Sequence, residues 1–149
     1  MYYTYHSVIF ILSLHDTLYG MRKNFQKWHK QKTTIDESIG KALFQEREVW
    51  WCALGINVGS EQDGGKNFER PVVIIKKFNL DACLVIPLTG RSKRGKYYFS
   101  VGLIKGRNAV AILSQLRFID RKRLANKICT LDEGVFRKLV ASIVRASLL

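Results

Sequence analysis

The sequence contains few cysteines, and their spacing excludes the usual structural and catalytic uses of this residue. Cys52, Cys83 and Cys129 are odd in number, lie far apart and form no C-x-x-C pair, and no neighbouring histidine completes a zinc set. They are surrounded by no cysteine-protease or redox signature. We therefore expect three reduced, mostly buried thiols in a cytoplasmic protein.

Long hydrophobic runs are also lacking. Residues 7–14 are apolar but too few to cross a bilayer, and no Lys or Arg precedes them as in a signal peptide. We therefore expect no association with a membrane. A basic stretch opens at Met21, so we interpret residues 1–20 as lying upstream of the true translation start.

Acidic residues are scarce relative to basic ones. The 12 Asp and Glu residues face 25 Lys and Arg residues, a formal net charge of +13. Such a positive field favours a phosphate backbone, an anionic membrane or an acidic protein as a partner. Charge alone does not choose among these partners, and a solvated basic surface without nucleic acid is the remaining alternative.

Short β-rich runs dominate the chain from Glu48 onward, without internal repeats. We predict strands at residues 48–54, 71–78, 82–88, 96–103 and 109–119, the last long enough for two strands or one bent strand. Residues 71–78 are continuously apolar and should be central in a sheet, with Pro71 at the first strand position because it lacks an N–H. This pattern predicts a small closed or half-closed barrel.

Helices are predicted on both sides of this β-rich part. Residues 21–46 carry apolar side chains at helical spacing in a polar background, so one or two surface helices should form an N-terminal extension, residues 1–46, to a domain of residues 47–149. The basic face of this extension could contact RNA, but a solvated face is favoured. The fold class is therefore α+β, mainly β.

A capping box is predicted near the C-terminus, where Thr130 and Glu133 have the required spacing. A helix should start near Leu131. Its apolar stripe would lie against the barrel, formed by Leu131, Val135, Leu139 and Ile143.

The stretch of residues 55–71 predicts a binding loop, because so long a connection between strands is unusual without a function. It matches neither a phosphate-binding P-loop nor an EF-hand. Near its end, Pro71 restricts the backbone of Arg70 to an extended form, which would present the guanidinium in a fixed direction to a phosphate. The alternative is a salt bridge from Arg70 to a loop carboxylate.

A second group of candidates follows the strand at residues 82–88. The hydroxyl of Thr89 could donate to a phosphate oxygen, and the loop after it should track a nucleic-acid backbone through Arg91, Lys93, Arg94 and Lys96. All three histidines precede the β-rich part, which excludes a two-histidine acid–base pair within it. A carboxylate must then act as the general base, and Glu61 is the candidate.

Five blocks of the sequence together resemble the successive motifs of MazF/PemK-type toxins. They are residues 48–55 (EVWWCALG), 57–62 (NVGSEQ), 70–75 (RPVVII), 87–89 (PLT) and 113–124 (LSQLRFIDRKRL). The resemblance runs from about Arg47 to the C-terminus. Five blocks in the right order are far more specific than any one of them.

The resemblance implies an SH3-like barrel that forms a homodimer, cleaves single-stranded mRNA and is neutralised by a cognate antitoxin protein. Cleavage would use the 2′-hydroxyl as nucleophile and leave 2′,3′-cyclic phosphate and 5′-hydroxyl ends, without a metal or other cofactor. Arg70 and Thr89 match the catalytic arginine and threonine of the family. Glu61 and Gln62 match the loop that meets RNA, and Gln115 matches a polar position on the strand beneath it.

The sequence departs from the family pattern in three places. The stretch between Gln62 and Arg70 is longer than the common form, which affects the placement of Glu61. Ser114 stands where an acidic residue is frequent, and the shortest members lack the N-terminal extension. The alternative function is a non-catalytic module of the same barrel class that binds RNA or poisons a protein target.

Overall fold

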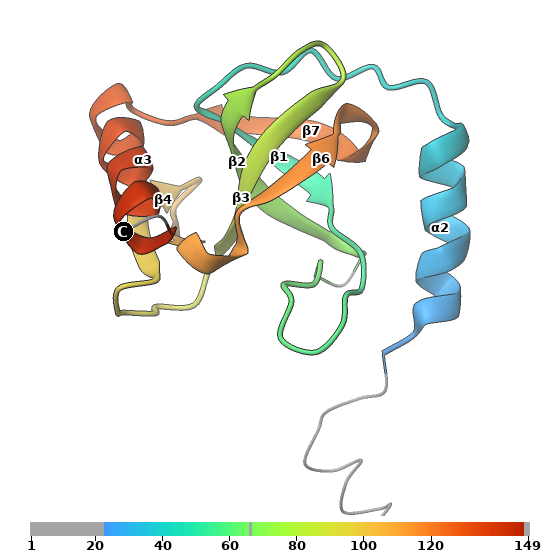
Figure 1. Cartoon of the computed structure of the whole chain (residues 1–149), viewed down its shortest axis with the longest axis horizontal. Coiled ribbons are helices and arrows are strands. Elements are labelled where there is room, and N and C mark those ends of the chain that lie inside the picture. The colour runs from blue at the N-terminus through green and yellow to red at the C-terminus, as the bar shows by residue number, and fades with distance from the viewer. Residues whose placement is uncertain (1–22, 66, 148–149) are drawn as a thin grey trace, which may run out of the picture.

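The protein is a strongly curved β-sheet with one helix on each of two opposite sides (Figure 1). The computed structural model describes residues 23–65 and 67–147. Helix α2 spans Phe25–Glu37 and helix α3 spans Glu133–Ser147. The prediction that residues 1–20 precede the true start lies outside the described residues.

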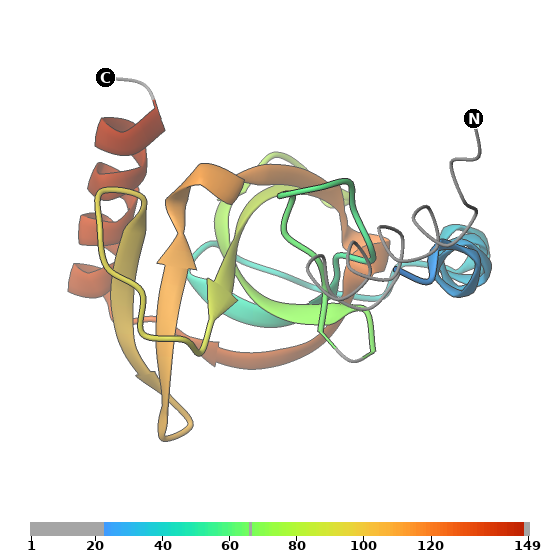
Figure 2. The same cartoon turned by 90° about the horizontal axis from the view of Figure 1, so that it is seen from below.

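Seven antiparallel strands form the sheet, in the order β4-β5-β3-β2-β1-β7, with β6 also paired to β3. Their bounds are Glu48–Ala53 (β1), Glu69–Lys77 (β2), Ala82–Thr89 (β3), Tyr98–Ile104 (β4), Arg107–Ile112 (β5), Arg117–Asp120 (β6) and Leu124–Thr130 (β7). Viewed from below, after a turn of 90° from Figure 1, the sheet curls around on itself as a half-barrel (Figure 2). The predicted α+β, mainly β fold class is confirmed.

The strand predictions hold at most positions. β2 lies between β1 and β3, as expected for the most apolar run. The long run at residues 109–119 forms two strands, because the 3-10 turn η1 at Leu113–Gln115 lets β5 and β6 pair with opposite ends of β3. β7 was missed because its polar sequence shows no alternation, and its only partner is β1 within the described residues.

The predicted position of Pro71 at the start of its strand is wrong by two residues. β2 begins at Glu69, and Pro71 pairs with Trp51 of β1. The ladder to β3 starts only at Val72, so the proline stands where the strand is paired on one side. A missing N–H is tolerated at such a position.

Both faces of the central strands are buried. Val49 and Val73 point into a cluster covered by Leu139 and Ile143 of α3, whereas the next residue of β1, Trp50, points into a second cluster inside the curved sheet. This follows from the two-residue period of a strand. Side chains on both faces therefore hold the sheet in its curled form.

The three thiols are free, with Cys52 and Cys83 fully buried and Cys129 half-buried. Burial raises the pKa of Cys52 and of Cys83 to about 12. A thiol with so high a pKa is a poor nucleophile near neutral pH, because almost none of it is thiolate. The expectation of mostly buried thiols is confirmed.

Helix α3 begins two residues later than predicted, and a different residue caps it. The Oδ1 atom of Asp132 accepts a hydrogen bond from the backbone N–H of Val135 at 3.0 Å. Thr130 instead pairs with Glu48 as the last residue of β7, and Glu133 forms an ion pair with Arg137. The capping-box prediction is therefore wrong, because the β7 ladder holds Thr130 in an extended conformation.

Helix α2 confirms the prediction of a surface helix in the extension. The side chain of Asn24 caps it by accepting a hydrogen bond from the N–H of Lys27 at 2.9 Å, and Trp28 is its one buried residue. None of the helices in the described part of the chain is long and apolar enough to cross a membrane.

Candidate active site

Arg70 and Thr89 lie together because adjacent strands carry them to the same end of the sheet. Val72 of β2 pairs with Pro87 of β3, and continuing this antiparallel register places Arg70 opposite Thr89. Both residues line one pocket with a volume of about 460 Å³. Trp51 of β1 and the β4–β5 turn at Lys105 and Arg107 line the same pocket.

The guanidinium of Arg70 is held by two backbone carbonyls. Its Nε donates to the carbonyl oxygen of Asp63 at 2.7 Å, and its Nη1 donates to that of Leu88 at 3.2 Å. Its Nη2 has no protein partner among the described residues. A guanidinium gripped by two carbonyls has a fixed orientation, which leaves one nitrogen to meet an anion.

The salt-bridge alternative for Arg70 does not hold within the described residues. The carboxylate of Asp63 pairs with Lys23 at 2.8 Å, and Arg70 makes no ion pair there. Burial lowers the pKa of Arg70, while the charge of Asp63 acts in the opposite direction and Arg91 lowers it further. An arginine guanidinium keeps its charge at physiological pH, because the charge is delocalised over the planar group.

Thr89 is one of two buried polar side chains in the described part of the chain, with 8% of its surface exposed. It pairs with Val110 of β5, and its Oγ1 accepts a hydrogen bond from the N–H of Arg91 at 3.3 Å. This contact uses an oxygen lone pair, and no acceptor for the hydroxyl proton is found among the described residues, so the proton is available to donate into the pocket.

The predicted loop residues are brought together, but not into the pocket of Arg70. Gln115, on η1, accepts from the N–H of Gln62 at 3.0 Å and donates to the carbonyl of Ser60 at 3.4 Å. The exposed carboxylate of Glu61 accepts from the N–H of Val58 at 3.0 Å. Gln115 therefore ties the loop to the sheet, and Glu61 bonds within its own loop.

The basic loop after Thr89 is exposed. Arg91, Lys93, Arg94 and Lys96 lie in the connection from β3 to β4, which starts at the pocket. Lys93 lies 5.4 Å from the ring of Tyr98, and Lys96 lies 4.8 Å from that of Tyr97. None of these four cations lines the pocket of Arg70 and Thr89, and Lys96 lies at a separate hollow with Ser142 and Arg145 of α3.

Three residues of the pocket wall were not singled out by the sequence. Trp51 is 41% exposed next to the buried Trp50, and the continuously apolar run within β1 gave no signal that separates the two. Lys105 and Arg107 flank Gly106 in the β4–β5 turn, where Lys105 and Gly106 both have positive φ. A Lys-Gly pair between two β-rich runs is a turn signal that could have located them.

Comparison with protein families matches residues 45–146 to the PemK-like, MazF-like toxins of type II toxin–antitoxin systems. The chain belongs to this family. MazF/PemK toxins are known as endoribonucleases. Comparison with curated proteins finds no significant match.

Solved MazF-like structures share the fold at low sequence identity. MazF from Deinococcus radiodurans has a TM-score of 0.57 and 16% identity, over 70% of this chain and 96% of that one. The toxin MazF-mt6 from Mycobacterium tuberculosis has a TM-score of 0.52 and 17% identity, over 67% and 95%. An endoribonuclease from a mycobacterial species, solved with its cognate antitoxin, has a TM-score of 0.55 and 11% identity, over 69% and 93%.

Proposed function

We propose that this chain is a toxin endoribonuclease that cleaves single-stranded mRNA at a phosphodiester held by Arg70 and Thr89. The observation that carries the proposal is that these two side chains line one pocket. They stand on the neighbouring strands β2 and β3, at the same end of the sheet. Family membership supports the reaction class. The products would carry 2′,3′-cyclic phosphate and 5′-hydroxyl ends.

The chemistry follows from where negative charge develops. Attack of the 2′-hydroxyl oxygen on phosphorus, with its proton passing to a general base, forms the P–O2′ bond and adds charge to the phosphoryl oxygens. The P–O5′ bond then breaks, and the leaving 5′-oxygen takes a proton from solvent. A fixed guanidinium nitrogen and the hydroxyl of Thr89 stabilise this charged state more than the ground state, and only that difference accelerates the reaction. Lys105 and Arg107 across the pocket would hold the neighbouring phosphates.

Glu61 remains our candidate for the general base, supplied by the loop beside the pocket. Its carboxylate bonds to its own loop in the free protein, so RNA binding would have to redirect it toward a 2′-hydroxyl. The same proposal includes Gln62, Gln115 and the cations of the basic loop as RNA contacts. It also includes a homodimer as the active form and a cognate antitoxin as the inhibiting partner.

The test is the substitution Arg70→Ala, assayed on a long single-stranded RNA in EDTA with mapping of the ends. The wild type should produce discrete cuts bearing cyclic phosphates. Arg70→Ala should lower kcat by about 10²-fold or more, because it removes a positive charge from the transition state. The control is Arg137→Ala on the exposed face of α3, which should retain full activity and the same melting temperature.

A non-catalytic module is the competing function, and the same assay separates the two. RNA that stays intact with wild-type protein, together with binding that survives Arg70→Ala, would reject the nuclease. Full cleavage by a folded Arg70→Ala variant would reject our assignment of the site while leaving the nuclease in place.

A further inference from the structure

Helix α2 of the extension packs directly against the loop that leads to Arg70. We call this connection, residues 55–65 and 67–69, the site loop. Trp28 is 7% exposed and forms a small core of its own with Ala53 and Phe68, to which Ile35 and Ile56 are added. This core joins the extension to both ends of the site loop.

The fit between Trp28 and the site loop is close. Gly55 has a φ of 78°, and a Cβ added there would lie 2.0 Å from Cε2 of Trp28, so only glycine can occupy this position. At the other end of the loop, Phe68 has a φ of 60° and its ring centroid lies 5.6 Å from that of Trp28. The N–H of Gly55 donates to the carbonyl of Phe68 at 2.9 Å, so the indole covers the point where the loop closes.

A second contact from the extension reaches the residue that orients Arg70. Lys23 pairs with Oδ2 of Asp63 at 2.8 Å and also donates to the carbonyl of Asn57 at 2.8 Å. Oδ1 of Asp63 accepts from the N–H of Asn57 at 2.6 Å. The carbonyl of the same Asp63 is the acceptor for Nε of Arg70. Asp63 therefore links Lys23 to the candidate catalytic arginine.

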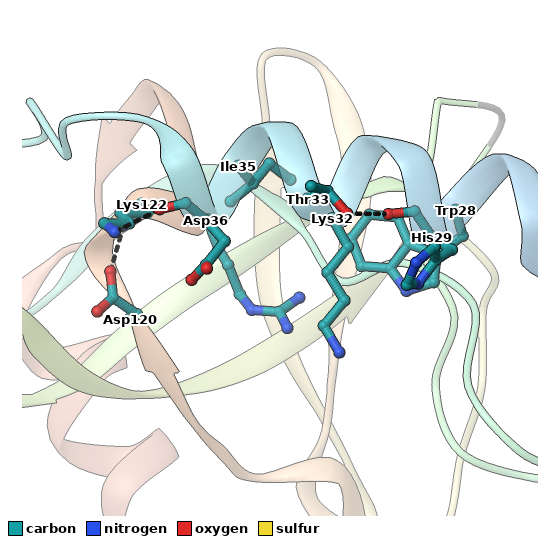
Figure 3. Close-up of a pocket in the computed structure, with 9 residues that line it drawn as sticks. Trp28, His29, Lys32, Thr33, Ile35, Asp36, Asp120 and Lys122 are labelled. Atoms are coloured by element: carbon teal, nitrogen blue, oxygen red, sulfur yellow. Dashed lines mark hydrogen bonds between the residues drawn. The ribbon is translucent and has the colours of Figure 1, made fainter.

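The barrel holds the far half of α2 as well. Lys122 donates to the carbonyl of Asp36 at 2.6 Å, and Figure 3 shows Trp28, Asp36 and Lys122 along the groove between the helix and the barrel. Arg123 donates to the carbonyl of Ala53 at 2.8 Å and lies 5.7 Å from the ring of Trp28. Contacts at both ends allow α2 to act as a rigid brace on the loop.

We propose that α2 is a positioning element of the active site, in which Trp28 and Lys23 set the direction of the Arg70 guanidinium through the site loop. The inference rests on the proposed role of Arg70. A long loop rich in glycine has many conformations, and the brace selects the one in which the carbonyl of Asp63 meets Nε of Arg70. Trp28 and Lys23 touch no substrate in this proposal.

The experiment compares full-length Lys23→Met, Trp28→Ala and Trp28→Phe with the control Phe25→Ala, a half-exposed aromatic on the same helix. For each we would measure kcat and KM on single-stranded RNA, the melting temperature, and the ¹H–¹⁵N signal of the Arg70 Nε–H, assigned by its loss in Arg70→Lys. A double variant, Lys23→Met with Asp63→Asn, tests whether the two residues act through one ion pair.

We expect Lys23→Met and Trp28→Ala to lower kcat about tenfold, with KM changed by less than about twofold, because misdirection of a catalytic group slows chemistry more than binding. The Arg70 Nε–H signal should move or broaden in both. Trp28→Phe should recover most of the loss, the double variant should match Lys23→Met, and Phe25→Ala should resemble the wild type.

The inference is overturned if the Arg70 signal and kcat stay at wild-type values in Lys23→Met and Trp28→Ala, or if only KM rises. Should Trp28→Ala not fold, Lys23→Met decides alone, because Lys23 is partly exposed and lies outside the buried cores. Should the wild type leave RNA intact, the proposed function fails separately. The Arg70 Nε–H signal then still tests the brace.

Discussion

Among single residues, Glu48 shows how a buried charge is stabilised in this protein. It is 7% exposed, and its carboxylate accepts from Lys127 at 2.6 Å, from the indole N–H of Trp50 at 2.8 Å and from the N–H of Gln45 at 2.9 Å. Burial acts to raise the pKa of Glu48, but the hydrogen bonds from Lys127 and Trp50 outweigh it, so the pKa lies below its ordinary value of 4.5.

We predict that Glu48→Gln lowers the free energy of unfolding at pH 7 by about 2 kcal/mol, because hydrogen bonds to a charged group are lost. The folded pKa is lower than the unfolded one, so the contribution of the carboxylate is complete above pH 4.5 and disappears as the pH falls through the folded pKa. Urea unfolding at several pH values measures this difference. The exposed Glu133→Gln serves as the control, and a pH-independent difference would contradict the prediction.

At the scale of elements, the start of α3 depends on what precedes it. The sequence predicts Thr130 as its cap, but the β7 ladder holds Thr130, and the side chain of Asp132 accepts the backbone N–H of Val135 instead. An N-cap side chain that accepts a backbone N–H stabilises a helix, whereas a residue at the end of a strand does not.

Asp132→Ala should therefore lower the free energy of unfolding by about 1 kcal/mol, since the N–H of Val135 loses its acceptor. Thr130→Ala is the matched control and should have a clearly smaller effect. Thermal unfolding of both variants gives the comparison. A larger loss of unfolding free energy in Thr130→Ala than in Asp132→Ala would contradict this prediction and support the capping box that the sequence predicts.

For the whole molecule, the net charge of +13 provides a long-range attraction in any encounter with RNA. The loop from β3 to β4, which begins at the pocket with Gly90, carries part of this charge. Replacing Lys93, Arg94 and Lys96 by Gln should reduce the slope of log affinity against log salt by about 2, the value expected for three lost phosphate contacts on a single strand. Binding to RNA would be measured with proteins that all carry Arg70→Ala, so that the RNA is not cleaved.

The control for this charge prediction is a second triple variant of exposed lysines elsewhere, at Lys41, Lys76 and Lys138. It removes the same net charge. An equal reduction of the salt slope in both variants would show that only the net charge matters, and would remove the basic loop from the binding surface.

The local pattern of the sequence was sufficient for every strand except β7 and for two residues of the pocket. Short β-rich runs bounded by turn residues located β1 to β5, with β6 in the second half of the last run, and the strand-end positions of Arg70 and Thr89 made both of them candidates. Such features can be predicted from the sequence because they depend on residues that are neighbours in the chain.

Only the tertiary structure decided which partners these residues have. Asp63 was one possible ion-pair partner of Arg70, but Lys23 takes its carboxylate, and Arg70 bonds instead to its carbonyl. The same holds for Lys105 and Arg107 in the pocket wall and for Trp28 over Gly55. Most of these contacts join segments far apart in the chain, and the choice between the carboxylate and the carbonyl of Asp63 depends on the distant Lys23. Folding settles the competition among many possible partners, and the local pattern does not.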